Sequence, residues 1–515
     1  MTPTQRILFN TAASYGRSVV SIVLGLLSGR WILQALGSAD YGVFGAVGAI
    51  FFFMTTFNGV LRGSIARFFA WSIGRGRRLP PEESLRDIRA WFNVSLRIHV
   101  LAAIVFVAIL LPVGTHVVGH WLRLPPDRIP AAQIVFRCSL ASAAMIMVSA
   151  PYYAMYTARQ LIAELSLFFL VQSFLLAGVA RWLLHVPGDR VVAYARALCA
   201  LHCGIPALVM LWARFRFPAC RVRFRGDRIG ARARELLSFA GWQFFGSLCA
   251  VGRSQGLAIL IRRHFPLADN AAFSYAGQIS GHSDALSKSL ANALVPAITD
   301  AVGAGERRRA IDLAFRACKF GTLLVLLFAI PLSIECKEVV RLWLRTPPEH
   351  TAMLCTCMLL SHTVTKLSLG HMAAVSAHGR IALYQVLVGL SLFLTLPCAW
   401  GFVKLGWGIG SIGAALLLLA TASTLLRVAI ARVLLSMSVR RWISRIVLPL
   451  ALLSLVSATA GWAVHAALAP SILRIVLVSA VSVALTVLIG WFVVLDHPER
   501  RYAAAQWTRF RRKFA

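Results

Sequence analysis

Acidic residues are scarce in this chain, and charged residues of either sign are few. Its 515 residues include 19 Asp and Glu against 53 Lys and Arg; charged residues make up 14% of the total and hydrophobic residues 58%. Soluble globular domains carry more charge and disordered chains carry less apolar surface, so both classes are excluded. The formal net charge of +34 comes from basic residues that separate long apolar runs, and we therefore predict membrane loops and no nucleic-acid partner.

Patterns for metal sites and for extramembrane domains are also missing. Most of the ten Cys lie within or beside apolar segments, where small packing residues are expected rather than disulfides. Cys355 and Cys357 have no His or Cys at zinc spacing, so we predict no metal and no cofactor. No polar stretch is long enough for a separate domain. The first apolar stretch is too long for a signal peptide and is expected to be retained.

Long apolar runs fill the chain instead. A spanning helix needs about 20 mainly apolar residues, and the resulting prediction is an all-α, polytopic membrane protein with about 14 transmembrane helices. The predicted spans are 9–34, 41–73, 92–118, 131–156, 161–184, 191–213, 236–262, 270–299, 313–335, 351–376, 381–403, 408–431, 445–467 and 472–496.

Lys and Arg gather in alternate loops, which predicts the orientation. The richer set of loops includes the segment 75–89, the run 214–234, the Arg307 to Arg309 triplet and the C-terminal tail. This bias places both termini in the cytoplasm, as an even number of spans requires. We expect Glu164 and Asp300, near cytoplasmic helix ends, to be solvated.

An internal repeat organises the chain. One offset of 229 residues aligns Asp40 with Asp269 and Gly74 with Gly303. We therefore predict two pseudo-symmetric six-helix lobes. The predicted domains are an N-lobe at 1–213 (helices 1–6), an Arg-rich cytoplasmic linker at 214–235, a C-lobe at 236–432 (helices 7–12), and helices 13–14 with a basic tail at 433–515.

Polar and charged residues recur on single faces of several spans. In the N-lobe, Arg17 lies on a stripe with Ser and Asn residues, and Asn58 and Arg62 follow Thr55 at helical spacing, with Arg67 a turn further on. Because ionisable groups are costly inside a membrane, such stripes are expected to line a central cavity between the lobes. For Arg67, snorkelling to the lipid headgroups is an equally good explanation.

The second half repeats the pattern with different charges. Asp284 and Lys288 are four residues apart on one helix, and a structural ion pair there is as plausible as a coupling role for Asp284. Arg253 is a cavity candidate on the preceding helix, and Lys366, near His362, is a weaker one. A lumen rich in Arg attracts phosphate or carboxylate, so the predicted cargo is anionic.

Several short motifs stand at the ends of the predicted helices. The segment Leu36 to Phe44 has the pattern LG-x-x-x-YG-x-[FY], and Arg67-Phe68-Phe69-Ala70 is followed by Gly74. The first resembles a turn, and the second the end of the second helix, in bacterial polysaccharide-biosynthesis flippases of the multidrug/oligosaccharidyl-lipid/polysaccharide exporter superfamily. Further resemblances occur at Pro296 before 303–306, at Leu342-Trp343-Leu344 and at 377–380. The resemblance covers roughly residues 1–440, and Pro347-Pro348 replaces a Gly that usually follows Trp-Leu.

The resemblance implies a two-lobed flippase of the bacterial inner membrane that moves a polyprenyl-pyrophosphate-linked oligosaccharide (O-antigen or exopolysaccharide) to the periplasmic leaflet by alternating access. Expected partners are this lipid-linked substrate, membrane lipids, and the polysaccharide polymerase and chain-length machinery. The family's cationic lumen is matched in role by Arg17, Arg62 and Arg253. Together with the stripes, the predicted substrate-binding residues are Arg17, Asn58, Arg62, Arg67, Arg253 and Lys288, with Asp284 for coupling.

Other functions stay open at this point. The main alternative is a multidrug or cation antiporter of the same superfamily, which would depend on a lumen acid such as Asp284. A peptidoglycan-precursor flippase differs only in cargo. A membrane glycosyltransferase or polymerase needs a catalytic loop and acidic residues that the sequence lacks, so we predict a transporter and not an enzyme.

Overall fold

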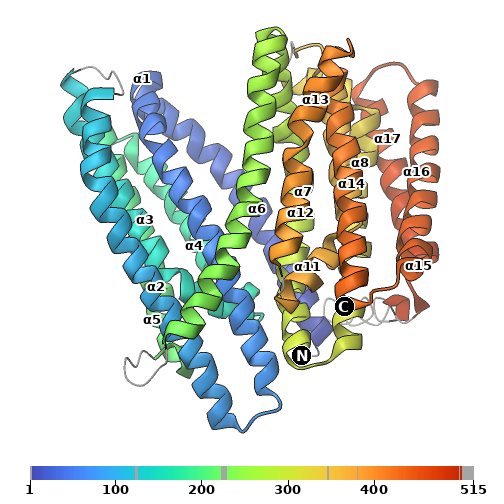
Figure 1. Cartoon of the computed structure of the whole chain (residues 1–515). Helices are drawn as coiled ribbons and strands as arrows, with labels where there is room; N and C mark the ends of the chain where they lie inside the picture. Colours follow the sequence, from blue (N-terminus) through green and yellow to red (C-terminus); the bar gives the residue numbers. More distant parts are fainter. Residues whose placement is uncertain are drawn as a thin grey trace, which may run out of the picture. The chain divides into compact units, whose positions relative to one another are not determined.

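The computed structural model describes residues 3–121, 126–221, 229–344, 347–379, 381–497 and 499–501. Every secondary-structure element in this part of the chain is a helix, which confirms the predicted all-α class (Figure 1). The middle of the predicted linker (222–228), Arg380 and the tail beyond 501 lie outside the described residues. So do the side chains of 41–57, including Thr55.

Contacts divide the chain into two compact units. Unit 1 is Met1–Phe244 with Thr299–Arg307, and unit 2 is Phe245–Ile298 with Arg308–Ala515. The unit boundaries differ from the predicted lobes, because the first part of α6 and the end of α7 group with unit 1. We describe each unit by itself.

Unit 1 contains the helices of the first six predicted spans. The first two predicted spans form one long element, α1, which is broken at Gly37, where φ is +74° and the backbone is not helical. The helices are α1 (Pro3–Gly76), α2 (Pro81–His116), α3 (Ile129–Ala158), α4 (Ile162–Leu183), α5 (Arg190–Arg216) and the first part of α6 (Ile229–His264), with the short turns η1 (Val117–Trp121), η2 (Pro126–Arg128) and η3 (Pro218–Cys220).

A shared apolar core holds unit 1 together. α1 packs along α3 and α4, and α3 packs along α5. Ile32 and Phe136 are buried in one cluster with Leu183 and Tyr194, which come from α1, α3, α4 and α5. Small residues such as Ala132, fully buried in the same cluster, allow the helices to approach closely. This packing orients the polar face of α1 described below.

Unit 2 contains the remaining spans. Its helices are the rest of α6, α7 (Leu267–Gly303) up to Ile298, α8 (Arg307–Ile334), α9 (Cys336–Leu344), α10 (Thr351–Lys366), α11 (Leu369–His378), α12 (Ala382–Phe393), α13 (Thr395–Lys404), α14 (Gly410–Leu435), α15 (Val439–Trp442), α16 (Leu448–Ala467) and α17 (Ile472–Ile489), with the π-helical turns η4 (Ile443–Val447) and η5 (Gly490–Val494).

Two of the predicted spans in unit 2 are not single helices. The predicted span 351–376 is broken into α10 and α11, which bend by 48° at residues 367–368. The span 381–403 is interrupted at Leu394 between α12 and α13. Hydropathy averaged over a window does not report such breaks, because each segment is apolar enough overall to be read as one span.

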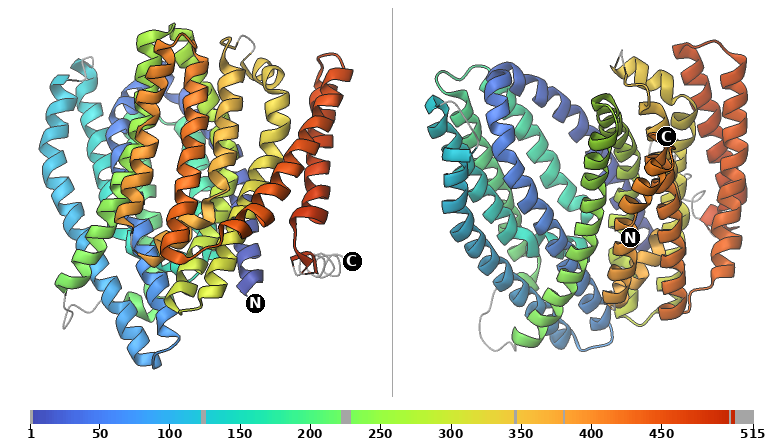
Figure 2. Two further views of the ribbon diagram at one scale, coloured as in Figure 1. Left: turned by 45° about the vertical axis from the view of Figure 1, so that its right-hand side comes forward. Right: turned by 45° about the horizontal axis from the view of Figure 1, so that its top comes forward.

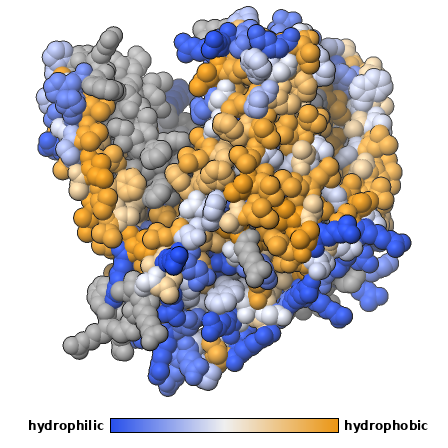
Figure 3. Space-filling view, in the orientation of Figure 1, coloured by the Kyte–Doolittle hydropathy of each residue, from blue (hydrophilic) through white to orange (hydrophobic). Residues whose placement is uncertain are grey.

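Eleven helices of the described part are long and apolar enough to cross a membrane, and the bent pair α10–α11 makes a twelfth if it counts as one span. The predicted spans 41–73 and 270–299 are also helical, within α1 and α7, and the described part of α7 includes the shorter apolar helix Leu290–Gly303. Figure 3 shows hydrophobic side chains along the helices and hydrophilic ones gathered toward the helix ends on the visible face. A multi-pass membrane protein follows from these lengths and this surface.

The last two helices, α16 and α17, pack on each other as a pair in both views of Figure 2. A buried ion network joins α16 and α17 to Glu335, the residue that follows α8. Glu335, 1% exposed, lies 2.7 Å from His465 Nδ1 and 3.0 Å from Arg474 Nε. Arg474 is 5% exposed, so this network replaces the hydration that both groups lose.

The repeated glycines meet inside unit 1. A Cβ on Gly74 would overlap the carbonyl oxygen of Asp300, and a Cβ on Gly303 would overlap that of Trp71. Trp71 and Asp300 are themselves 229 residues apart, like the two glycines. The ends of α1 and α7 therefore cross at equivalent positions of the repeat, and only glycine allows the backbones to lie this close.

Candidate functional site

A polar pocket of about 130 Å³ lies inside unit 1. Its wall comes from α1, α3, α4 and α5, four helices from separate parts of the chain. The lining residues are Asn58, Arg62, Ile146, Ser149, Ala150, Tyr153, Phe169, Gln172, His202 and Pro206. Two of the predicted binding residues, Asn58 and Arg62, thus face the same cavity.

Hydrogen bonds fix the α1 side of this pocket. The amide of Asn58 donates to the carbonyl oxygen of Ile146 at 3.4 Å, and the hydroxyl of Ser149 donates to the same oxygen at 2.9 Å. Asn58 is 6% exposed, so its orientation is held by α3. Arg62 follows one helical turn later on the same face of α1.

Positive charge dominates the pocket. No Asp or Glu is among its lining residues, and no acid of the described chain forms an ion pair with Arg62. Tyr153, Gln172 and His202 add neutral groups able to donate hydrogen bonds. A guanidinium surrounded by neutral donors is suited to an anion such as phosphate or carboxylate.

Arg17 and Arg67 are placed differently from Arg62. The Arg17 guanidinium lies over the ring of Phe169 at 5.1 Å, on a residue of the pocket wall. Arg67 lies over the rings of both Phe68 and Phe239, 4.7 and 4.6 Å from their centroids. The structure therefore brings Arg17 against the pocket wall, whereas Arg67 packs against two aromatic rings and does not line the pocket.

The acid predicted for coupling, Asp284, is paired with two cations in unit 2. Its carboxylate lies 2.8 Å from Lys288 Nζ on the same helix and 2.5 Å from Lys366 Nζ on α10. The side chains of Asp284 and Lys366 are each 10% exposed, whereas Lys288 is 69% exposed. Asp284 is thus compensated, and the three groups together carry a net positive charge.

Further titratable side chains lie near Asp284, Lys288 and Lys366. His362 on α10 lies within electrostatic range of Asp284, Lys366 and Lys288, and also of Arg253 on α6. Arg253 in turn lies within range of Arg427, a buried residue of α14. The structure thus gathers the three predicted residues Arg253, Asp284 and Lys288 into one region of unit 2, in which cations outnumber the single acid.

A second cavity, of about 380 Å³, lies in unit 1 beside the α1–α7 crossing. Arg77 and Arg159 line it together with Asp300, which pairs with Arg77 at 2.5 Å. Burial lowers the pKa of the Arg159 guanidinium, an effect that Asp300 partly opposes. The expectation that Asp300 is solvated was wrong, because it is 2% exposed and lies under the crossing.

No family model and no curated protein matches the sequence. Among solved structures, a MATE transporter in the bent conformation superposes with a TM-score of 0.73 at 14% identity over 85% of this chain and 96% of that chain. The Vibrio cholerae MATE transporter VcmN gives 0.71 at 16% identity over 85% and 98%.

The chain has the fold of MATE transporters of the MOP superfamily. A third similar structure is a MOP superfamily transporter from Pyrococcus furiosus, described as having a binding pocket of reverse polarity that suggests a different function. It superposes with a TM-score of 0.67 at 16% identity over 84% of this chain and 96% of that chain. This likeness is one of fold.

Several polar residues of the Arg62 pocket and of the region around Asp284 were not predicted from the sequence. Tyr153 and His202 lie in apolar segments of α3 and α5, where one polar residue gives no periodic signal. Arg427 lies in the apolar helix α14, within the predicted span 408–431, and an ionisable residue inside a predicted membrane span was the one available sign of a function. Lys366, a weaker candidate from the sequence, is a direct partner of Asp284.

Proposed function

We propose that this protein is a membrane transporter of an anionic substrate. The observation that carries the proposal is the sign of charge inside both units. Arg62 faces a pocket lined by no acid, and Asp284 is compensated by Lys288 and Lys366 while Arg253 adds a further cation. Anionic cargo compensates such charge, whereas cationic cargo would be repelled.

The cargo class that fits best is a polyprenyl-pyrophosphate-linked oligosaccharide, moved to the periplasmic leaflet of the bacterial inner membrane by alternating access. Its pyrophosphate would replace lost hydration with guanidinium hydrogen bonds. Its polyprenyl tail would stay in the lipid, because transferring each CH₂ group into water costs about 0.8 kcal/mol. Tyr153, Gln172 and His202 offer donors and acceptors suited to sugar hydroxyls.

A multidrug or cation antiporter is the second candidate, and the fold likeness favours it. The similar solved structures include an outward-facing multidrug resistance MATE family transporter of the MOP superfamily, with a TM-score of 0.69 at 15% identity over 84% of this chain and 96% of that chain. A cation antiporter needs an acid that is free to exchange its partner. Asp284 is the acid of the unit 2 cluster that would have to do so.

The deciding experiment is leaflet translocation of a labelled polyprenyl-pyrophosphate saccharide in proteoliposomes, with wild type, Arg62→Ala and a matched control. Arg86→Ala is the control, because Arg86 is an Arg of unit 1 with a 75% exposed side chain that lines no described pocket. Translocation by wild type and the control, and its loss in Arg62→Ala, is the expected result.

The antiporter is tested in the same vesicles with a cationic dye and an imposed proton or sodium gradient. Dye movement that is lost in Asp284→Asn, combined with no translocation of several different glycans, would favour the antiporter and end the flippase proposal. Equal translocation by wild type and Arg62→Ala would remove Arg62 from the substrate pathway.

A further inference from the structure

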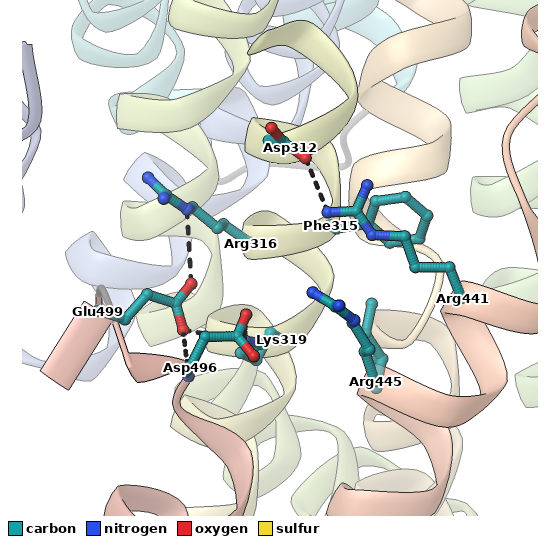
Figure 4. Close-up of a pocket in the computed structure, with 9 residues that line it drawn as sticks. Asp312, Phe315, Arg316, Lys319, Arg441, Arg445, Asp496 and Glu499 are labelled. Carbon is teal, nitrogen blue, oxygen red and sulfur yellow. Dashed lines mark hydrogen bonds and ion pairs between the residues drawn. The ribbon is translucent and has the colours of Figure 1, made fainter. Parts of the chain in front are cut away.

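A charged cavity in unit 2 shares no residue with the region around Asp284. It has a volume of about 140 Å³ and lies where the first turns of α8 meet the α15–η4 segment and the residues that follow η5 (Figure 4). Its lining residues are Asp312, Phe315, Arg316, Lys319, Arg441, Arg445, Ile446, Asp496 and Glu499.

Ion pairs across the cavity join the three segments. Arg441 lies 2.8 Å from Asp312 and places its guanidinium over the lining aromatic ring of α8. Lys319, whose side chain is 4% exposed, lies 3.1 Å from Asp496 and 2.9 Å from Glu499. These contacts hold α15 and the segment after η5 against α8, and they engage all three lining carboxylates.

One cation is in surplus. Arg316 shares Glu499 with Lys319 at a distance of 3.4 Å. Arg445 is the fourth lining cation, and no acid of the described residues forms an ion pair with it. Figure 4 shows the Arg445 guanidinium among the other lining side chains, with no interaction drawn to it. Four cations face three carboxylates, so the cavity can accept one negative charge beside Arg445.

The surface next to Arg445 is suited to a hydrocarbon chain. Leu448, Leu452 and Leu455 follow Arg445 along η4 and α16 at steps of three, four and three residues, which keeps them close to one side of the helix. Their exposures are 60%, 50% and 63%. A phosphate held at Arg445 would therefore continue directly into an apolar row, an arrangement that suits a lipid better than a free anion.

We propose that this cavity binds an anionic phospholipid, with the headgroup phosphate at Arg445 and an acyl chain along Leu448, Leu452 and Leu455. The bound lipid neutralises the surplus charge at the junction of α8, α15 and the segment after η5. This site does not depend on what the protein transports, because it shares no residue with the pocket of Arg62 or the region of Asp284.

The test compares retention of phosphatidylglycerol and phosphatidylcholine by the purified full chain, using native mass spectrometry at matched lipid concentrations. The wild type should retain phosphatidylglycerol preferentially, and Arg445→Ala should lower that retention about fivefold, since one cation near a membrane surface contributes about 1 kcal/mol. Arg440→Ala is the matched control, because Arg440 is an exposed arginine of α15 that does not line the cavity. Arg445 is exposed as well, so both variants should fold.

A second arm separates a lipid from a free phosphate. Leu452→Ser should weaken retention of phosphatidylglycerol several-fold while binding of inorganic phosphate, measured by calorimetry, stays unchanged. If phosphatidylglycerol and phosphatidylcholine are retained equally, or Arg445→Ala behaves like Arg440→Ala, the proposal is wrong. If inorganic phosphate at millimolar concentration displaces the lipid and Leu452→Ser has no effect, the occupant is a free anion and the lipid assignment is overturned.

Discussion

The polar regions of the two units reach the same sign of charge by different means. In unit 1, Arg62 faces a pocket whose lining contains no acid. In unit 2, Asp284 is held between Lys288 and Lys366, and the excess of cations surrounds a fixed ion pair. The two units thus carry the same sign of charge on residues that are paired differently. We expect the region of unit 1 to accept an anionic ligand directly, whereas in unit 2 Lys288 must leave Asp284 before it can bind one.

The largest expected effect is on stability, in unit 2. Asp284→Asn leaves Lys366 without its anion in a site that is 10% exposed, and removing one partner of a buried pair costs about 3 to 5 kcal/mol. Thermal unfolding in detergent should show a clear drop in midpoint. The double variant Asp284→Asn, Lys366→Met should recover much of this loss, and a failure to recover would mean that Asp284 stabilises unit 2 through other contacts.

Substitutions at Gly74 and Gly303, where α1 and α7 cross, test whether the two glycines have equivalent roles in packing. Gly74→Ala and Gly303→Ala each place a methyl group against a backbone carbonyl, so each should cost about 1 to 3 kcal/mol, by similar amounts. Gly178→Ala is a control, because nothing lies within contact distance of a Cβ there. Unfolding midpoints of the three variants measure the effect, and a large difference between the first two would contradict an equivalent role.

Arg62 should govern transport and leave stability almost unchanged. Hydrogen bonds from a charged donor contribute about 1.5 to 3 kcal/mol, so Arg62→Ala should lower translocation about 10- to 100-fold. Arg62→Lys keeps the charge without the planar fork and should retain an intermediate rate. Initial rates in proteoliposomes at matched protein density distinguish these variants. A rate for Arg62→Lys equal to that of wild type would show that the planar guanidinium geometry at Arg62 is unimportant.

The smallest effect is expected at Lys288. Its side chain is 69% exposed, and exposed ion pairs contribute about 1 kcal/mol or less, so Lys288→Ala should leave the unfolding midpoint nearly unchanged. If Lys288 exchanges from Asp284 to an anionic ligand, the same variant should raise the substrate concentration needed for half-maximal transport. A midpoint drop as large as that of Asp284→Asn would instead assign Lys288 a structural role.

Much of the fold could be predicted, because apolar length and loop charge are local properties of the sequence. The segments predicted as spans are helical, and the pair Asp284 and Lys288 follows from helical spacing alone. The breaks at 367–368 and Leu394 could not be predicted, since hydropathy averaged over a span does not report the backbone geometry inside it. The predicted orientation of the termini stays a prediction.

The sequence by itself determined the membrane class, the helices and the cationic excess, because each depends on composition or on spacing along one helix, and it predicted the repeat. Only the tertiary structure decided which polar residues meet. It brought Tyr153 and His202 to Arg62, paired Lys366 with Asp284, and packed Arg67 against two aromatic rings. Such contacts join helices that are far apart in the chain, and they depend on how apolar faces pack, which no periodicity within a single segment records.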